Sequence, residues 1–455
     1  LNGYTCKKLG YVGGTLKCKP LTCVYDTSGC HQCGNKVLDA KEQCDGALLK
    51  AKSCKGLLYQ GGTLTCKSDC TYDKAGCWTV KDSAHVPLTY LQAGDQTAPD
   101  IACTTGSCLV VYSSAGKLRG QRVDGNGKLV GKAFAIAKGS GNQLYPAVVL
   151  DGSHYFVVWQ DHRASVPHIR GAKLTTTGIV ALPDFLVSNK STGQYLPALA
   201  CDGSSCLVTW RDGSQNAGAS NPRSIHGTLV AKNGIVKTPA GVAYGGGTSY
   251  GKAAVYPSSV ASSGANYLVT WITRIDAHNN HKGYFYGRVV DTSGKVVGAL
   301  VNYQYTQGYY GPADPDVVWD GKVYSMAYST YSQTSINSNT SVQLASAKGA
   351  KLGAAKVATS QGGGVAPESS VSGGVTLVVW NQFRKYNSNT IKGVLVRDGK
   401  AASSVISITG NGNTIYDYTG HPAAAHDGTQ HHVVWAQKVN TTVGYDIFLR
   451  RVKTN

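Results

Sequence analysis

Few side chains in this sequence are arranged as a hydrolytic enzyme would need them. Glutamate occurs only at Glu42 and Glu368, and Glu368 stands at the start of an expected strand where related copies have Ala, Asp or Ser. Most aspartates lie in turns, where Asp stabilises backbone geometry. No H-E-x-x-H, G-x-S-x-G or P-loop pattern is present. A paired-Asp glycosidase mechanism stays open, and it requires two Asp residues that converge in one pocket.

Metal and cofactor sites are not expected either. The densest histidine group is His421, His426, His431 and His432. Because neighbours on a strand point to opposite faces, His431 and His432 do not easily bind one ion. His31 lies inside a Cys30-x-x-Cys33 pattern, but a zinc site usually shows a second matched Cys/His pair. We therefore expect no catalytic residue, no metal and no cofactor.

One repeated stretch organises most of the chain. Residues Tyr145–Trp159, YPAVVLDGSHYFVVW, predict two strands joined by an Asp-Gly turn. Six further copies occur at Pro99–Tyr112, Pro197–Trp210, Pro257–Trp271, Pro315–Tyr328, Pro367–Trp380 and Pro422–Trp435. Each is followed by a third strand, in most copies with a recurring Gly, as in Ile169–Leu174, and then by a shorter fourth strand. The large aromatic that ends each second strand is expected to pack between blades.

Seven such copies predict an all-β, seven-bladed β-propeller of four-stranded antiparallel blades. The blades are expected to start near residues 97, 143, 194, 251, 311, 365 and 421. The seventh copy ends after its third strand, so residues 85–94 are expected to supply the missing strand and close the ring. The propeller would occupy residues 79–455, and residues 1–78 would form a separate disulfide-rich repeat region.

Ten of the 14 cysteines lie in the first 77 residues. Segments Cys6–Cys30 and Cys54–Cys77 share Tyr-x-Gly-Gly-Thr-Leu-x-Cys and Tyr-Asp-x-x-Gly-Cys, whereas Cys33–Gly46 has no counterpart before Cys6. The region is thus interpreted as one partial and one full unit. Dense cysteines indicate disulfides and an oxidising compartment. No apolar run is long enough to span a membrane. Because the chain starts at Leu1 with no signal peptide, we interpret it as a processed or truncated secreted or cell-surface protein.

The expected disulfides follow from the turns. Gly-Gly hairpins would join Cys6 to Cys18 and Cys54 to Cys66, and Asp-x-x-Gly turns would join Cys23 to Cys30 and Cys70 to Cys77. Cys33 would then pair with Cys44, although other connectivities stay open. Two blade hairpins carry Cys-x4-Cys instead, which predicts disulfides joining Cys103 to Cys108 and Cys201 to Cys206.

The blade phrase, DG-x-x-Y-x-VVW followed by a G-x-x-V strand, resembles the extracellular propeller repeats of myxobacteria and related soil or aquatic bacteria. The segment GN-x-x-LDA-x-EQCDG…GGTL-x-C…YD-x-x-GC resembles the cysteine-rich repeats often found beside them. The two resemblances cover nearly the whole chain. They imply secretion or surface exposure, but they imply no catalytic residue.

Recognition is expected in the loops before the third strands, which vary most between copies. These are Ser214–Gly227, Thr273–Gly287 and Ser329–Ser341, with Asn302–Gly311 beside them, and they are rich in Tyr, Asn and Ser. The candidate binding residues are Asn221, Arg223, His278, Asn279, Asn280, His281, Tyr284, Tyr303, Tyr305, Tyr309, Tyr310 and Tyr331.

The leading functional hypothesis is a secreted, non-catalytic structural or adhesive surface protein. The propeller would be a rigid module, and the cysteine-rich arm would join subunits into a filament or array. The net charge of +19 is consistent with either a soluble surface or an anionic partner. Nucleic acid is disfavoured as that partner, because the lysines are scattered and the chain is expected to be secreted. The alternatives are a lectin-like binder of (anionic) polysaccharide and a glycan-cleaving propeller enzyme.

Overall fold

A computed structural model describes residues 2–454 apart from 12, 20–23, 32, 40–41, 82–84, 90–93, 214–222, 247–252, 256–257, 278–279, 308–311, 333–334, 360–363, 383–389, 410–420 and 441–443. The chain divides into two compact units. The first, here called the cysteine-rich region, comprises Leu1–Val80 with Ala402–Ser404 and Lys453–Asn455. The second, the propeller, comprises Lys81–Ala401 and Val405–Val452. None of the described helices could cross a membrane.

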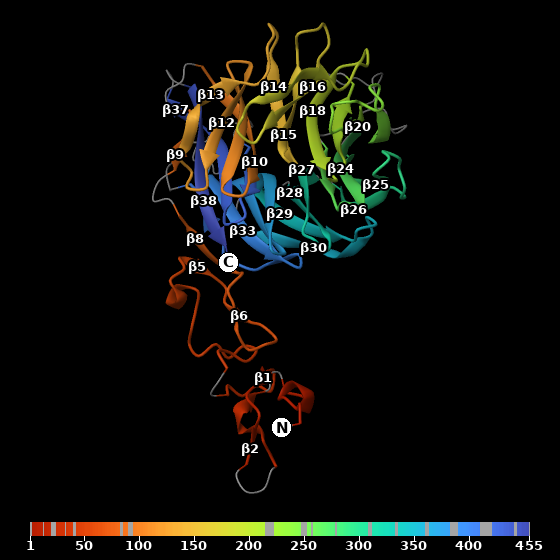
Figure 1. Ribbon diagram of the computed structural model, residues 1–455. Helices are drawn as coiled ribbons and strands as arrows, with labels where there is room; N and C mark the ends of the chain where they lie inside the picture. Colours follow the sequence, from red (N-terminus) through yellow and green to blue (C-terminus); the bar gives the residue numbers. More distant parts are fainter. Residues whose placement is uncertain are drawn as a thin grey trace. The chain divides into compact units, whose positions relative to one another are not determined.

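The propeller consists of seven antiparallel sheets that follow one another in chain order, which confirms the predicted fold class (Figure 1). Blades 1, 2, 3 and 5 are simple meanders of four strands. Their strands are β10 (Gln96–Thr104), β11 (Ser107–Ser114), β12 (Lys117–Asp124) and β13 (Leu129–Ala135); β14 (Gln143–Asp151), β15 (His154–Asp161), β16 (His168–Thr175) and β17 (Val180–Leu186); β18 (Gln194–Cys201), β19 (Ser205–Asp212), β20 (Ser224–Ala231) and β21 (Val242–Gly246); and β27 (Pro312–Trp319), β28 (Tyr324–Ser332), β29 (Ser335–Ala345) and β30 (Lys351–Thr359).

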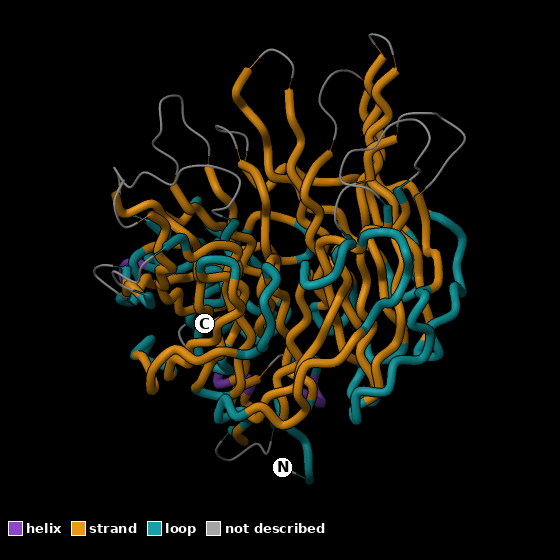
Figure 2. Tube along the Cα trace, turned by 90° about the horizontal axis from the view of Figure 1, so that it is seen from above, coloured by secondary structure: helices purple, strands orange, loops and turns teal. Residues whose placement is uncertain are grey.

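In blades 4 and 6, one strand position is divided between two short strands. Blade 4 starts with β22 (Ala253–Val255) and β23 (Ser259–Ser262), which both pair with β24 (Asn266–Ala277), and it continues with β25 (Asn280–Asp291) and β26 (Val301–Gln307). Blade 6 comprises β31 (Gly364–Ser372), β32 (Val375–Gln382) and β33 (Thr390–Arg397), and β33 pairs with both β34 (Lys400–Ala401) and β35 (Ile406–Ser407). Extended strands make up most of the described propeller, and turns and loops join them (Figure 2).

Blade 7 is completed by an N-terminal strand, as predicted. It contains β36 (Ala423–His426), β37 (His431–Asn440) and β38 (Gly444–Thr454), and β9 (Val86–Pro87) pairs with β38. Beyond β9, the Leu88 amide donates to the Ile447 carbonyl at 2.8 Å. The Thr89 hydroxyl donates to Asp446 Oδ1 at 3.2 Å and accepts from the Ile447 amide at 2.8 Å. The closing strand is shorter than residues 85–94, of which 90–93 lie outside the described residues.

The core lies between the blades. The second strands are buried on both faces because a neighbouring blade covers each side, so their sequences are continuously apolar. Trp159, for example, is fully buried with Tyr155 and Val157 of its own blade and Leu109 and Val111 of blade 1. The aromatics at the equivalent positions are also buried, namely Tyr112, Trp210, Trp271, Tyr328, Trp380 and Trp435. Their predicted inter-blade packing is confirmed.

A bulge recurs near the start of the first strand. In five blades the residue before the strand's Pro has a positive φ of 47–54°, and the strand register shifts there. These residues are Ala98, Tyr145, Leu196, Asp314 and Ala366. A bulge re-aims the side chains that follow it. It therefore sets the direction of the residue directly after each Pro.

The cysteine-rich region contains two similar units of very short strands. The first has the 3-10 helices η1 (Lys7–Leu9) and η2 (Thr27–Gly29) and pairs β1 (Gly13–Gly14) with β4 (Cys30–His31) and β2 (Lys17–Cys18) with β3 (Tyr25–Asp26). The second has η3 (Lys55–Leu57) and pairs β5 (Gly61–Gly62) with β8 (Cys77–Val80) and β6 (Thr65–Cys66) with β7 (Tyr72–Asp73).

Candidate functional site

Six disulfides join the described cysteines. They link Cys6 to Cys30, Cys33 to Cys70, Cys44 to Cys66, Cys54 to Cys77, Cys103 to Cys108 and Cys201 to Cys206. The two blade hairpin disulfides are confirmed. The pairing expected within the cysteine-rich region is wrong in its joins of Cys6 to Cys18, Cys54 to Cys66, Cys23 to Cys30, Cys70 to Cys77 and Cys33 to Cys44. Cys23 itself lies outside the described residues.

The error has a structural reason. The Gly-Gly pairs do not form hairpin tips but lie in strands beside the last cysteine of each unit. Gly14 is opposite Cys30, and Gly62 is opposite Cys77. An added Cβ at Gly62 would come within 2.0 Å of the Gly76 carbonyl oxygen, so only glycine allows this approach. The first and last cysteines of each unit are thereby brought together.

In the second unit, residues 33–39 and 42–49 cover the β6–β7 hairpin. Two disulfides attach this covering segment, Cys33 to Cys70 and Cys44 to Cys66. The Gln43 amide donates to the Cys70 carbonyl at 3.0 Å, and the Tyr72 amide donates to Gln43 Oε1 at 3.1 Å. The Tyr72 hydroxyl donates to the Leu49 carbonyl at 3.0 Å. Cross-links and hydrogen bonds thus hold the segment in place.

In the first unit, no described residues cover the equivalent hairpin, β2–β3. Cys18 corresponds to Cys66, yet Cys18 is exposed and is the free cysteine of the described chain. Val24, beside β3, is 58% exposed. Tyr25 corresponds to Tyr72 and packs against Tyr4, with ring centroids 5.3 Å apart. Among the described residues, the same hairpin is therefore covered in one unit and uncovered in the other.

The twelve predicted binding residues have different outcomes. Asn221, His278, Asn279, Tyr309 and Tyr310 lie outside the described residues. Asn280, His281 and Tyr331 are placed only as backbone, the first two in β25 and the third in β28. Arg223 is partly buried just before β20. Tyr303 is wrong as a binding residue, because it is fully buried and its hydroxyl donates to the Gly349 carbonyl at 2.6 Å.

Tyr284 and Tyr305 belong to an aromatic group on blade 4. The Tyr284 ring stacks on Tyr286 at 5.5 Å with an interplanar angle of 5°, and it lies 5.0 Å from the Tyr305 ring. Tyr286 in turn packs near Trp271 at 6.1 Å. Tyr305 is 43% exposed, and Tyr284 and Tyr286 are partly buried. The group offers a supported aromatic surface of the kind that binds the apolar face of a ligand.

The C-terminal histidines His431 and His432 contact polar side chains. His431 Nδ1 lies 3.0 Å from Ser370 Oγ, and burial lowers the pKa of His431 to about 3. His432 Nε2 lies 2.9 Å from Asp427 Oδ2, and both side chains are fully buried. Elsewhere in the described chain, Asp151, Cys201 and Cys206 converge as metal ligands would, but both sulfurs belong to a disulfide. Among the described residues, the histidines therefore do not form a group of three converging ligands, and Cys201 and Cys206 are not thiolates.

Sequence reasoning missed a group of carboxylates near the propeller axis. Asp100 in β10, Asp316 in β27 and Glu368 in β31 each follow the Pro of a first strand. Burial raises the pKa of Asp100 to about 7 and that of Asp316 to about 6. Burial and the carboxylates of Asp316 and Asp100 raise the pKa of Glu368 well above its usual value. The available signal was an acid at one fixed repeat position in three copies.

No family profile and no curated protein matches the sequence. Among solved structures, a puromycin hydrolase S511A mutant is similar with a TM-score of 0.50 and 12% identity over 79% of this chain. This chain spans about half, 52%, of the length of that hydrolase. The polysaccharide lyase Uly1 has a TM-score of 0.49 at 9% identity, covering 80% of this chain and 90% of the lyase. A Penicillium chrysogenum α-L-arabinanase has a TM-score of 0.44 at 8% identity, covering 82% and 98%. At 12% identity, the similarity to the hydrolase shows a shared fold alone.

Proposed function

We propose that this is a secreted, non-catalytic structural or adhesive surface protein whose molecules join through the first cysteine-rich unit. The six disulfides indicate an oxidising, extracellular environment. The proposal is carried by one observation, which is that the hairpin covered in the second unit has no equivalent cover among the described residues of the first.

The second unit supplies the pattern for the contact. There the cover contributes the partner of Cys66 and donors and acceptors for the backbone around Cys70. In the proposed contact, a neighbouring molecule places an extended segment over the β2–β3 hairpin, where Cys18 is exposed. Because the two surfaces that meet are different, the contact is heterologous, and repetition gives a filament or array rather than a closed dimer.

The test compares the full chain with Cys18→Arg, by size-exclusion chromatography and electron microscopy of particles. We expect oligomers in the wild-type protein and their loss in C18R, because the larger charged side chain would occupy the exposed surface that the neighbouring segment covers. Lys19→Ser, at the next exposed position, is the matched control and should assemble normally. Monodisperse monomers of the wild-type protein at high concentration would contradict the proposal.

Polysaccharide binding is a second candidate, favoured by the exposed stack of Tyr284, Tyr286 and Tyr305. The net charge of +19 would favour anionic chains. A glycan array at low and moderate salt should show binding that falls at least about tenfold in the double variant Tyr284→Ala/Tyr305→Ala. Tyr145→Ala removes an equally exposed tyrosine from blade 2 and should have no effect. An array without binding at either salt concentration would exclude this candidate.

A further inference from the structure

The three missed carboxylates occupy equivalent positions in the ring of first strands. In each blade, one first-strand residue pairs with the residue that directly precedes the large aromatic of the second strand. In blades 1 to 7 these first-strand residues are Asp100, Ala147, Ala198, Ser259, Asp316, Glu368 and Ala423. Acids stand only in blades 1, 5 and 6, and the other four side chains are small. Glu368 responds electrostatically to both Asp316 and Asp100, so the three groups face a common space.

No Lys or Arg of the described residues is a main influence on the pKa values of these three carboxylates. The main influences are burial, hydrogen bonds and other carboxylates, including Asp314 beside Glu368. The titratable base nearby is His421. Burial lowers the pKa of His421, and the Asp314 carboxylate raises it. A cluster of carboxylates without Lys or Arg among these influences is unusual in a chain with 44 Lys and Arg and 25 Asp and Glu residues. Clustered carboxylates in low-dielectric surroundings favour either a proton or a bound cation.

Two buried oxygen atoms at this place have no hydrogen-bond partner. Asp316 Oδ1 accepts from the Ser259 hydroxyl at 3.1 Å, but the buried Oδ2 is unpartnered. Both the hydroxyl and the amide of Ser369 lower the pKa of Asp316, and the buried Ser369 hydroxyl oxygen has no close hydrogen-bond partner among the described residues. Such an atom destabilises a fold by about 1–3 kcal/mol. A donor that reached both oxygens would remove this penalty.

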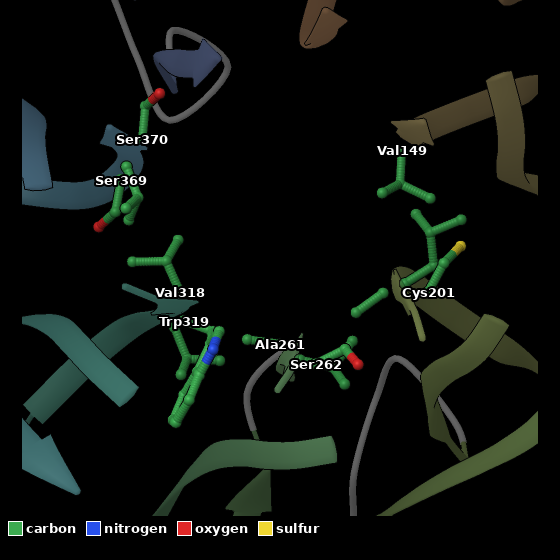
Figure 3. Close-up of a pocket in the computed structure, with 13 residues that line it drawn as sticks. Val149, Cys201, Ala261, Ser262, Val318, Trp319, Ser369 and Ser370 are labelled. Carbon is green, nitrogen blue, oxygen red and sulfur yellow. The ribbon is translucent and has the colours of Figure 1, made fainter. Parts of the chain in front are cut away.

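Ser369 connects the carboxylates to a cavity. The cavity has a volume of about 310 Å³ and opens among the first strands of blades 2 to 6 (Figure 3). Val149 and Cys201 lie across it from Ser369 and Ser370, with Ala261, Ser262 and Trp319 between them. The remaining lining is mostly Val, Leu and Ala. The cavity is therefore mostly apolar, and its lining includes Val317 and Ser369, the residues that directly follow Asp316 and Glu368 in their strands.

We propose that this channel binds a primary ammonium group on an aliphatic chain, with the ammonium at Asp100, Asp316 and Glu368 and the aliphatic part in the cavity. An ammonium group has three donors for oxygens that are spread apart. A single metal ion fits less well, since the carboxylates of these described residues do not form a set whose ligand atoms all lie within 4.8 Å. A free diamine and a lysine side chain of a partner protein present the same chemistry.

Binding of an ammonium group should depend on pH. The amine stays protonated up to about pH 10, whereas the carboxylates ionise progressively as the pH rises through about 6 to 7. Affinity should therefore increase with pH in this range, and binding should release protons. Asp314 adds negative charge, and His421 with its lowered pKa adds no positive charge at neutral pH.

The experiment is isothermal titration calorimetry of the full chain with 1,5-diaminopentane and with Nα-acetyl-lysine amide, at about pH 5.5 and about pH 8. We expect at least about tenfold tighter binding at the higher pH, with no binding of 1,5-pentanediol. Binding of only the lysine amide would identify a peptide source, and binding of only the diamine a free amine.

Asp316→Asn and Glu368→Gln should each weaken binding about tenfold, whereas Asp202→Asn, an equal charge change in a turn, should not. Thermal melts identify any variant that fails to fold, and the pH dependence of the wild-type protein is a test that needs no variant. The proposal is overturned if neither amine binds at about pH 8, if E368Q binds as well as wild type, or if Ca²⁺ binds in place of the amines. Release of reducing sugar from a glycan panel that is lost in E368Q would overturn it in favour of an enzyme.

Discussion

The propeller and the cysteine-rich region are stabilised in opposite ways. The propeller buries a large aromatic in every blade, including five fully buried tryptophans. In the cysteine-rich region, the buried apolar residues are mainly cysteines, namely Cys6, Cys44, Cys54, Cys70 and Cys77, with Leu16, Leu64 and Val80. A unit with so little apolar surface cannot fold on packing alone. One chain thus combines a fold held by packing with a fold held by cross-links.

The most sensitive test of the propeller half of this comparison is Trp159→Ala. Trp159 is fully buried between blades 1 and 2, so its truncation should lower the free energy of unfolding by about 3–5 kcal/mol. Calorimetric melts should show the loss in the propeller transition. Tyr145→Ala, which removes an exposed ring from the same blade, should change it by less than about 1 kcal/mol. Equal effects of the two variants would show that inter-blade packing is not the main source of stability.

The corresponding test of the cysteine-rich region is the double variant Cys54→Ser/Cys77→Ser. Loss of this disulfide should destabilise the second unit by about 2–5 kcal/mol and expose it to proteases, because it closes a 23-residue separation in a unit with little core. Limited proteolysis with mass spectrometry should map new cleavages to residues 33–80, while the propeller melt stays unchanged. The control is Cys103→Ser/Cys108→Ser, whose five-residue separation lies in a hairpin that strand pairing already fixes.

The same contrast explains what the sequence could predict. The blade repeats carried their own hairpin turns, so the blades, the closing strand and the Cys103 and Cys201 disulfides followed from local pattern. The disulfides of Cys6 and Cys54 did not, because they depend on Gly14 and Gly62 pairing with a strand far along the chain. Tyr303 looked like a loop residue although its ring faces the core. The carboxylates of Asp100 and Glu368 come together only when seven blades close a ring.

Blade 7 is where the packed propeller depends most on individual polar contacts, and Thr89→Val tests this. The variant is nearly isosteric but removes the hydroxyl that both donates to Asp446 and accepts from the Ile447 amide. Because the buried Ile447 amide then lacks its acceptor, the free energy of unfolding should fall by about 2 kcal/mol. Hydrogen exchange should increase first in β38. Thr177→Val, at an exposed turn, is the control, and an equally small effect at both sites would mean that closure does not depend on these bonds.

The smallest effect concerns the polar channel inside the otherwise apolar propeller. The pKa of Asp100 is raised from 3.8 to about 7 by burial. Between these values the unfolded chain has lost a proton that the folded chain still holds. The free energy of unfolding should therefore fall as the pH rises from about 4 to about 7, and the loss should be complete above that.

Asp100→Asn removes this titration. The variant should gain stability relative to wild type across the same pH range, by about 1–2 kcal/mol after allowance for the partial exposure of Asp100 to the channel. The substitution also weakens the hydrogen bond that the Val148 amide donates to Asp100 Oδ2. This loss of stability is the same at every pH, so it does not change the slope of stability against pH. His431 and Asp427 titrate in both proteins, so their contributions cancel in the stability difference between D100N and wild type. In Asp291→Asn the slope should have the opposite sign, because hydrogen bonds from Ser293 lower the pKa of Asp291. A pH-independent difference for D100N would mean that water in the channel keeps Asp100 ionised at neutral pH, and the channel would then be wet rather than apolar.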